Sequence, residues 1–272
     1  MPLSLHLIQP TSVPIEVEGV VPSTVRDKTL AEIEQLEVFC GNRKMPLAEF
    51  FQVTGEAGDE TMVWSGNLSG VHWLGAKMTS GRVIIEGAAG RHIGSEMSGG
   101  EIQVHGSAGD WVGGEMHGGL IHVHGDAGHL VGAAYRGSQR GMSRGTILID
   151  GSAGNEIGHT MRRGLIAVGG SAGDLVGFNL LAGTILVFGD VGIRHGAGMR
   201  RGTIGLWSEN RPDLLPSFRS ACRARPLAID LVLEDLRQKG FEIPSRLKTC
   251  QFDLYNGDLI EGGRGEILLT AV

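Results

Sequence analysis

Residues 99–116 read GGEIQVHGSAGDWVGGEM, and residues 118–132 repeat the pattern as GGLIHVHGDAGHLVG. The second glycine of the AG pair marks the period, and its successive intervals are 19, 19, 26, 19 and 19 residues. A period near 20 residues is typical of a solenoid, in which each repeat packs only on its neighbours. The marker glycines are Gly90, Gly109, Gly128, Gly154, Gly173 and Gly192.

Each repeat contains one segment that alternates like a β-strand. Its second and fourth residues are aliphatic and mostly β-branched, which predicts a strand with one buried face. Stacked repeats would align these residues in two inward columns. The columns are Val83, Ile102, Ile121, Ile147, Ile166, Ile185 and Ile204, and Ile85, Val104, Val123, Ile149, Val168, Val187 and Leu206.

Two further columns complete the predicted core. One runs through Leu74, Ile93, Val112, Val131, Ile157 and Val176, and the other through Met78, Met97, Met116, Met142, Met161, Leu180 and Met199. Flexible thioethers fill irregular gaps, so the methionine column is interpreted as core. With no helical periodicity in the repeats, we expect an all-β fold: a right-handed parallel β-helix of about seven rungs.

The two ends lack the repeat, and open sheet edges need covering. We expect a cap over residues 1–66, the β-helix over 67–208 and a second cap over 209–272, both caps mixing helix and strand. Residues 43–55 and 225–240 are predicted helices, the second stopped by Gly240, and residues 252–269 a final strand or hairpin.

The amino-acid composition narrows the classes of function that the chain can have. Gly makes up 45 of 272 residues, more than twice the usual 7% or so, which suits frequent sharp turns. A net charge of −6 argues against nucleic-acid binding. Three distant cysteines and the absence of a signal peptide or an apolar span favour a cytoplasmic chain away from membranes.

Catalytic and metal sites are not predicted. Glu86, His105, His124 and Asp150 share one outward column, with His122 nearby, but stacked side chains point in parallel and need not converge on an ion. His195 occupies the register position of Val176. It is interpreted as part of a distorted terminal rung rather than as a catalytic base.

Arginines are the more informative side chains. Arg144, Arg162, Arg163, Arg200 and Arg201 precede the strand-opening glycines, and the seven-residue insertion that breaks the period adds Tyr135, Arg136 and Arg140. Stacking would align these cations on one ridge, which could bind a polyanion or an acidic partner, or be a solvated row. Leu148, Leu165, Ala167, Leu186, Phe188 and Trp207 form an outward apolar strip that is either an interface or covered by the C-terminal segment.

The motif GGxIxVxGxAGxxVGxxM resembles the β-helix of the glutamate synthase C-terminal domain. The lead-in VFCGNRKMPLAEFFQVTGE and the insertion GAAYRGSQRGMSRG resemble more specifically the formylmethanofuran dehydrogenase C-subunit family, from about residue 36 to the end. That family occurs in tungsten or molybdenum dehydrogenases and in a bacterial formyltransferase/hydrolase complex. The C-terminal helix and the ending YNGDLIEGGRGEILL favour the latter.

The resemblance implies a scaffold subunit, with no cofactor of its own. Its partners would be an amidohydrolase-like hydrolase that holds the metal, a formyltransferase and a dehydrogenase-like subunit. The complex would move formyl groups between tetrahydromethanopterin and a furan-type carrier and release formate. Tyr135, Arg136, Arg140 and Arg144 would dock a partner or the carrier's polyglutamyl tail. A glutamate synthase-like domain protein remains an alternative.

Overall fold

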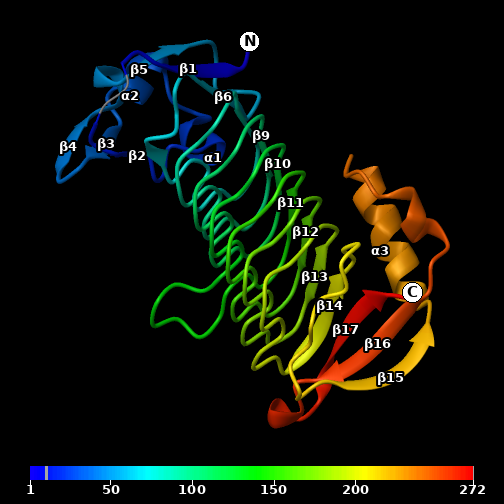
Figure 1. Cartoon of the computed structure of the whole chain (residues 1–272). Helices are drawn as coiled ribbons and strands as arrows, with labels where there is room; N and C mark the ends of the chain where they lie inside the picture. Colours follow the sequence, from blue (N-terminus) through cyan, green and yellow to red (C-terminus); the bar gives the residue numbers. More distant parts are fainter. Residues whose placement is uncertain (10–11, 272) are drawn as a thin grey trace.

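The computed structural model describes residues 1–9 and 12–271, which form a stack of similar turns with an irregular segment at each end (Figure 1). One strand of each turn joins a 13-stranded sheet in the order β15-β16-β17-β14-β13-β12-β11-β10-β9-β8-β6-β1-β5. Neighbours from β6 to β14 pair in parallel. The large, mainly parallel sheet confirms the predicted all-β class.

The repeat strands pair in the predicted register, with Ile121 opposite Ile102 on one side and Ile147 on the other. The strand-on-strand pairing of successive turns begins at β6, where Met62 and Trp64 lie opposite Val83 and Ile85. The strands of the stack are β6 (Thr61–Ser65), β8 (Arg82–Ile85), β9 (Glu101–Val104), β10 (Leu120–Val123), β11 (Thr146–Ile149), β12 (Leu165–Val168), β13 (Thr184–Val187) and β14 (Arg201–Leu206).

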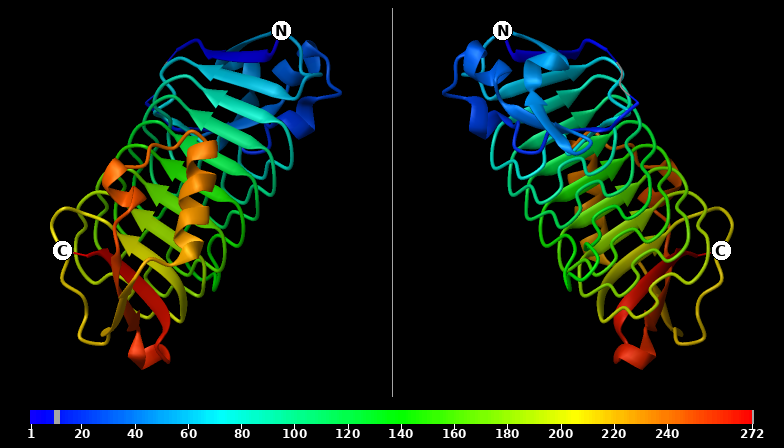
Figure 2. Two further views of the ribbon diagram at one scale, coloured as in Figure 1. Left: turned by 90° about the vertical axis from the view of Figure 1, so that its right-hand side faces the viewer. Right: turned by 90° about the vertical axis from the view of Figure 1, so that its left-hand side faces the viewer.

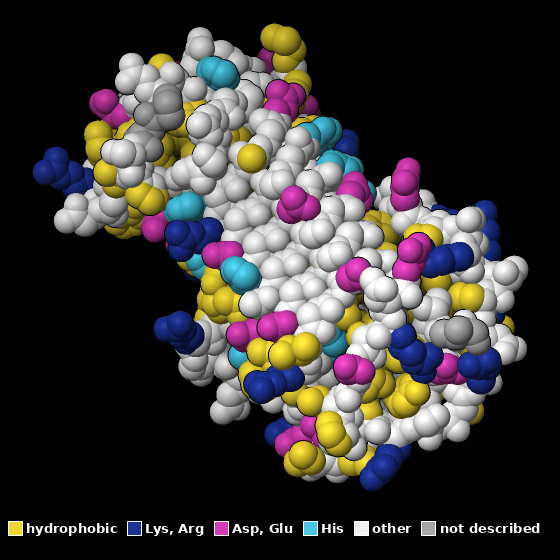
Figure 3. Space-filling view, in the orientation of Figure 1, with side chains coloured by type: hydrophobic (Ala, Val, Ile, Leu, Met, Phe, Trp, Pro, Cys, Tyr) yellow, Lys and Arg dark blue, Asp and Glu magenta, His cyan; other side chains and the backbone are white. Residues whose placement is uncertain are grey.

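All four predicted columns lie in the core, and their members are at most 1% exposed. A second wall of each turn is held by single parallel bridges. These bridges run through Leu68, Ala89, Ala108, Ala127, Ala153, Ala172 and Val191. On the face seen in Figure 3, the middle of the stack shows mainly backbone and side chains that are neither hydrophobic nor charged, with Lys and Arg toward its margins and ends.

The N-terminal segment covers the first turn with a mixture of short elements. β1 (Leu3–Leu7) pairs parallel with β6 and antiparallel with β5 (Phe51–Thr54). A separate four-stranded sheet runs in the order β4-β3-β2-β7. The remaining elements are β2 (Ile15–Glu16), α1 (Pro22–Val25), α2 (Leu30–Glu34), β3 (Glu37–Cys40), β4 (Arg43–Pro46), the 3-10 turn η1 (Leu47–Glu49) and β7 (Val71–His72).

The helix predicted for residues 43–55 is wrong. This stretch forms β4, η1 and β5 instead. Pro46 is extended, with φ −59° and ψ 144°, and proline disfavours the helical conformation in the residue before it. Phe51 and Val53 are buried on the face that pairs with β1, so tertiary pairing decides the outcome.

The C-terminal segment returns to the stack and covers it. β17 pairs parallel with β14 and antiparallel with β16, which confirms the predicted hairpin. The helix predicted at residues 225–240 is also confirmed, with Gly240 at φ 82° after its end. The elements are β15 (Arg219–Ala224), α3 (Leu227–Gln238), the 3-10 turns η2 (Ser245–Lys248) and η3 (Leu259–Glu261), β16 (Phe252–Gly257) and β17 (Arg264–Thr270).

Helix α3 lies across the outward face of the later repeat strands (Figure 2). Its Ile229, Leu233 and Leu236 join Leu148, Leu186 and Trp207 in a second buried cluster. The predicted apolar strip is therefore covered by the chain's own C-terminal segment. Two other leucines of α3, Leu227 and Leu231, point away from this cluster and are 82% and 74% exposed.

Among the described residues, none of the helices has the length and hydrophobicity of a membrane span.

Gly113 tests how tightly the turns are stacked. Its φ is 61°, and a Cβ there would lie 2.4 Å from Ile147 Cδ1. Gly113→Ala should therefore lower the free energy of unfolding by about 1–3 kcal/mol, measured by thermal or urea denaturation. Gly58, whose added Cβ would meet nothing within 4 Å, is the matched control. A Gly58→Ala loss equal to that of Gly113→Ala would contradict this explanation.

His195 makes the stack sensitive to acid. Its Nε2 lies 2.8 Å from the Gly192 carbonyl, its Nδ1 is buried without a partner among the described residues, and burial lowers its pKa. The unfolded chain therefore takes up a proton near pH 6.5 before the folded chain does, and stability falls as the pH drops below that value.

His195→Val should consequently raise the free energy of unfolding more at pH 5 than at pH 7.5. Urea denaturation at both pH values checks this, with the exposed His6→Gln as control. An equal effect of His195→Val at the two pH values would show that the proton plays no part.

Candidate functional site

The seven-residue insertion leaves the stack between β10 and β11 and projects as a loop (Figure 1). Its first residues stay in the fold, because Ala133 and Ala134 are buried. The Tyr135 backbone N–H then donates to Glu115 Oε1 at 2.9 Å. From Arg136 to Arg140 every residue is exposed. The loop is thus fixed at its base and presents its arginines to solvent.

Tyr135 anchors the loop on an aromatic ladder built by the preceding turns. Its ring stacks on Trp111 with centroids 4.8 Å apart, and its hydroxyl lies 3.2 Å from His92 Nδ1. His92 in turn stacks on Trp73 at 4.1 Å with the ring planes 6° apart. Trp73, His92 and Trp111 occupy the same corner of successive turns, each at φ 64–65°.

Both polar members of this ladder are uncharged at neutral pH, and burial moves their pKa values further from neutrality. It lowers the pKa of His92 to about 4 and raises the pKa of Tyr135 to about 12. A neutral imidazole packs between indole rings without the desolvation cost of a buried cation. The sequence predicted Tyr135 as part of the binding loop, but the structure shows a ring turned back onto the stack.

Three of the predicted arginines line one groove. Arg140 from the insertion, Arg162 before β12 and Arg200 before β14 border a pocket of about 670 Å³. Its other walls include His159, Asn179 and Glu261. The Arg200 guanidinium also pairs with Glu261 at 3.4 Å, so a single carboxylate accompanies the three cations. We call these pocket residues the arginine groove.

The remaining predicted arginines are exposed but do not border that groove. They are Arg136, Arg144, Arg163 and Arg201. The predicted ridge is therefore split, with some members facing the groove and the others facing solvent beside the strand starts. Stacked cations on the groove side can bind an extended anion through charge-assisted hydrogen bonds.

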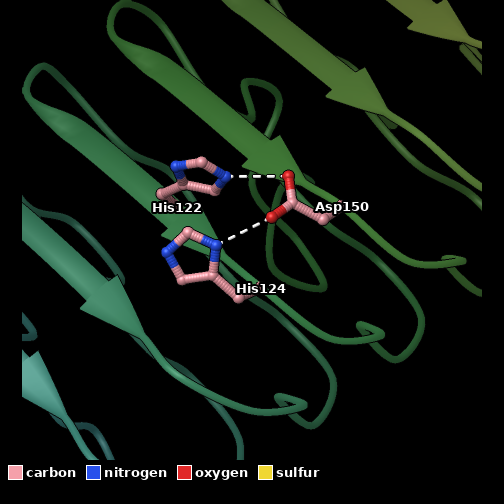
Figure 4. Close-up of side chains that lie close together, drawn as sticks. All are labelled: His122, His124 and Asp150. Atoms are coloured by element: carbon pink, nitrogen blue, oxygen red, sulfur yellow. Dashed lines mark hydrogen bonds and ion pairs between the residues drawn. The ribbon is translucent and has the colours of Figure 1, made fainter. Parts of the chain in front are cut away.

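Side chains of the outward column lie closer to one another than we expected from parallel stacking. His124 and Asp150 come from it as expected, but their side chains turn toward one another and toward His122 (Figure 4). Potential ligand atoms of these three residues all lie within 4.8 Å of one another. The expectation of parallel side chains failed because His122, two residues before His124 on the same face of the sheet, reaches across to the neighbouring strand end, with its Nε2 2.8 Å from Asp150 Oδ1.

The anchoring role of Tyr135 generates a test. Tyr135→Ala removes the stacking on Trp111 and frees the base of the insertion, so trypsin should cut after Arg136 and Arg140 several-fold faster. Gln139→Ala, a change at the exposed tip, should leave the cleavage rate unchanged. Mass spectrometry of the fragments gives the rates, and equal cleavage of the Tyr135→Ala and parent chains would exclude the anchor.

Similarity to known proteins points to one enzyme family, although no protein-family model matches the chain. The chain is 38% identical over 92 residues to the C subunit of tungsten-containing formylmethanofuran dehydrogenase 2 of Methanococcus maripaludis, 34% of each chain. It is 40% identical over 83 residues to the C subunit of molybdenum-containing formylmethanofuran dehydrogenase 1 of Methanosarcina barkeri, 29% of this chain and 28% of that one. The matched segment spans about a third of the length of these curated relatives.

A solved structure extends the similarity to the whole chain. A chain of the formyltransferase/hydrolase complex from Methylorubrum extorquens, crystallised in complex with methylofuran, superposes with a TM-score of 0.92. The match is 30% identical in sequence and covers 99% of this chain and 100% of that chain. On this end-to-end similarity, together with the two dehydrogenase matches, the chain belongs to the formylmethanofuran dehydrogenase C-subunit family.

Proposed function

We propose that this chain is a non-catalytic scaffold subunit of a cytoplasmic formyltransferase/hydrolase complex in one-carbon metabolism. The observation that carries the proposal is the end-to-end match to a chain of such a complex. In this proposal the complex moves formyl groups between tetrahydromethanopterin and a furan-type carrier and releases formate. Hydrolysis, with its metal, and formyl transfer belong to partner subunits, and the assembly also includes a dehydrogenase-like subunit.

The architecture suits a scaffold. We propose a right-handed parallel β-helix over residues 67–208, with the N-terminal cap at 1–66 and the C-terminal cap at 209–272. Regularly stacked turns present rigid walls, and the caps protect the open edges from pairing with other chains. The stack would hold its partners at fixed spacing without contributing reacting groups.

The insertion and the arginines are the proposed contact surface. Tyr135 fixes the loop, while Arg136, Arg140 and Arg144 would dock a partner subunit. The arginine groove offers the alternative of holding the polyglutamyl tail of the carrier, because Arg140, Arg162 and Arg200 line one continuous hollow. Arg163 and Arg201 lie on the solvent side and would extend either contact.

A second candidate is the C subunit of a tungsten- or molybdenum-dependent formylmethanofuran dehydrogenase. The curated matches favour it, since both name dehydrogenase subunits, although each covers only about a third of the chain. The end-to-end match is the reason to rank the hydrolase complex first.

Gentle purification of the tagged chain from its native host separates the two candidates. Co-purifying amidohydrolase-like and formyltransferase subunits, identified by mass spectrometry, would support the hydrolase complex. Tungsten or molybdenum with iron–sulfur partners would move the chain to the dehydrogenase. A chain that purifies alone as a monomer would refute the scaffold role.

The loop arginines can be tested in the same preparation. Arg136→Ala/Arg140→Ala removes two exposed cations, so it should weaken partner retention or carrier retention, each contact being worth about 1.5–3 kcal/mol at most. Arg43→Ala/Lys44→Ala on exposed β4 removes the same charge from the N-terminal segment and should leave both intact. Unchanged assembly, retention and activity in the loop variant would end this assignment.

A further inference from the structure

We propose that His122, His124 and Asp150 bind a divalent first-row transition-metal ion, for which Zn²⁺ is the natural probe. This site is separate from the arginine groove and does not depend on the proposed scaffold role. It lies on the outward face of the stack, at the carboxyl ends of two neighbouring strands (Figure 4).

The strands position the three side chains. His122 and His124 are two residues apart in and just after β10, so they share one face of the sheet, and their ring centroids are 4.1 Å apart. Asp150 follows β11, whose Ile149 pairs with Val123, so it stands beside His124. Nitrogen and carboxylate oxygen are favoured Zn²⁺ ligands.

The distances are close to those of a metal site. His122 Nε2 lies 2.8 Å from Asp150 Oδ1, and His124 Nδ1 lies 2.7 Å from Asp150 Oδ2. Ligands about 2.0–2.2 Å from a tetrahedral ion are roughly 3.3–3.6 Å apart. The side chains of His124 and Asp150 are 38% and 36% exposed, so they can separate by this small amount without disturbing the core.

A neighbouring hydrogen-bond chain determines which nitrogen of His124 is protonated. The Gln103 amide nitrogen donates to Glu101 Oε1 at 2.7 Å, and a carboxylate only accepts, which leaves Gln103 Oε1 facing His124 Nε2 at 2.9 Å. That contact requires a proton on Nε2. In a neutral ring Nδ1 then bears a lone pair, and it faces the Asp150 oxygen.

Two acceptors 2.7 Å apart, His124 Nδ1 and Asp150 Oδ2, repel unless a cation lies between them. A metal ion bound by Nδ1 and the carboxylate removes this conflict, and a ligating imidazole usually donates its other N–H to an oxygen acceptor, as His124 does to Gln103. The alternative is a second proton on His124, giving an imidazolium. A measurement of metal binding distinguishes a site for a metal ion from an imidazolium.

The surroundings leave room for further ligands. His124 and Asp150 border a pocket of about 490 Å³ whose opposite wall is residues 240–244, including Glu242. An ion held by three protein ligands on this wall would keep positions open for water or a carboxylate from the pocket. Oxygen and imidazole donors without thiolate select Zn²⁺ or a similar divalent ion over Cu⁺.

The test uses the full-length, untagged chain, stripped with a chelator and equilibrated with Zn²⁺. We expect one tightly bound ion per chain by elemental analysis, and visible absorption on substitution with Co²⁺. Asp150→Asn and His124→Gln should each lose stoichiometric binding. Gln103→Leu should weaken it by about 10–100-fold.

A control variant and a folding check accompany the Zn²⁺-binding measurement. His117→Gln removes another exposed imidazole, hydrogen-bonded to Ser143 rather than to this cluster, and should bind Zn²⁺ like the parent chain. Circular dichroism confirms that the partly exposed His124 and Asp150 variants remain folded. A parent chain that binds no ion, or an Asp150→Asn variant that binds equally well, would overturn the site and favour the imidazolium.

Discussion

Backbone packed directly on backbone is the constraint on which the rest of this structure depends. At one corner of each turn a glycine rests on the glycine of the turn before it: a Cβ on Gly106 would lie 2.5 Å from the Gly87 carbonyl carbon, and one on Gly189 2.6 Å from that of Gly170. Neither contact admits a side chain. These corners keep successive turns one strand spacing apart, and that spacing aligns every apolar column of the core.

Regular stacking also makes exceptions informative. A second outward column, different from the one that holds His124 and Asp150, contains Gln103 and His122. It continues as Leu148, Ala167 and Leu186 under α3. The column changes from polar to apolar where the C-terminal segment begins to cover it. The histidine–aspartate cluster lies at this border, with residues 240–244 across a pocket from it. The insertion departs from the repeat elsewhere on the stack, between β10 and β11.

The repeat made the core predictable, because each buried column appears in the sequence as one residue type at a fixed interval. The segments outside the repeat were harder to predict. Residues 43–55 carry a helix-like composition, but β5 takes its conformation from pairing with β1, a contact between residues far apart in the chain such as Leu5 and Val53. The apolar strip that includes Leu148 signalled that something covers it, but that α3 does so is likewise a long-range contact, which the strip alone could not decide.

Parts of the candidate sites were visible in the sequence and parts were not. Stacking predicted that Arg162 and Arg200 would align, but it could not show that Arg140 from an irregular loop would complete their groove. The HVH triplet at residues 122–124 was a usable signal, since alternation places both imidazoles on one face. The ring stacking of Tyr135 had no such signal in the sequence, because its partners belong to earlier turns of the stack.

That stacking has a consequence for how the molecule comes apart. In a solenoid whose turns touch only their neighbours, unfolding can fray inward from an end, one turn at a time. Tyr135 bypasses this order, since it leaves the turn after β10 and contacts Trp111 one turn back and His92 two turns back. Three consecutive turns are thereby coupled beyond nearest neighbours, and we expect them to open together rather than one at a time.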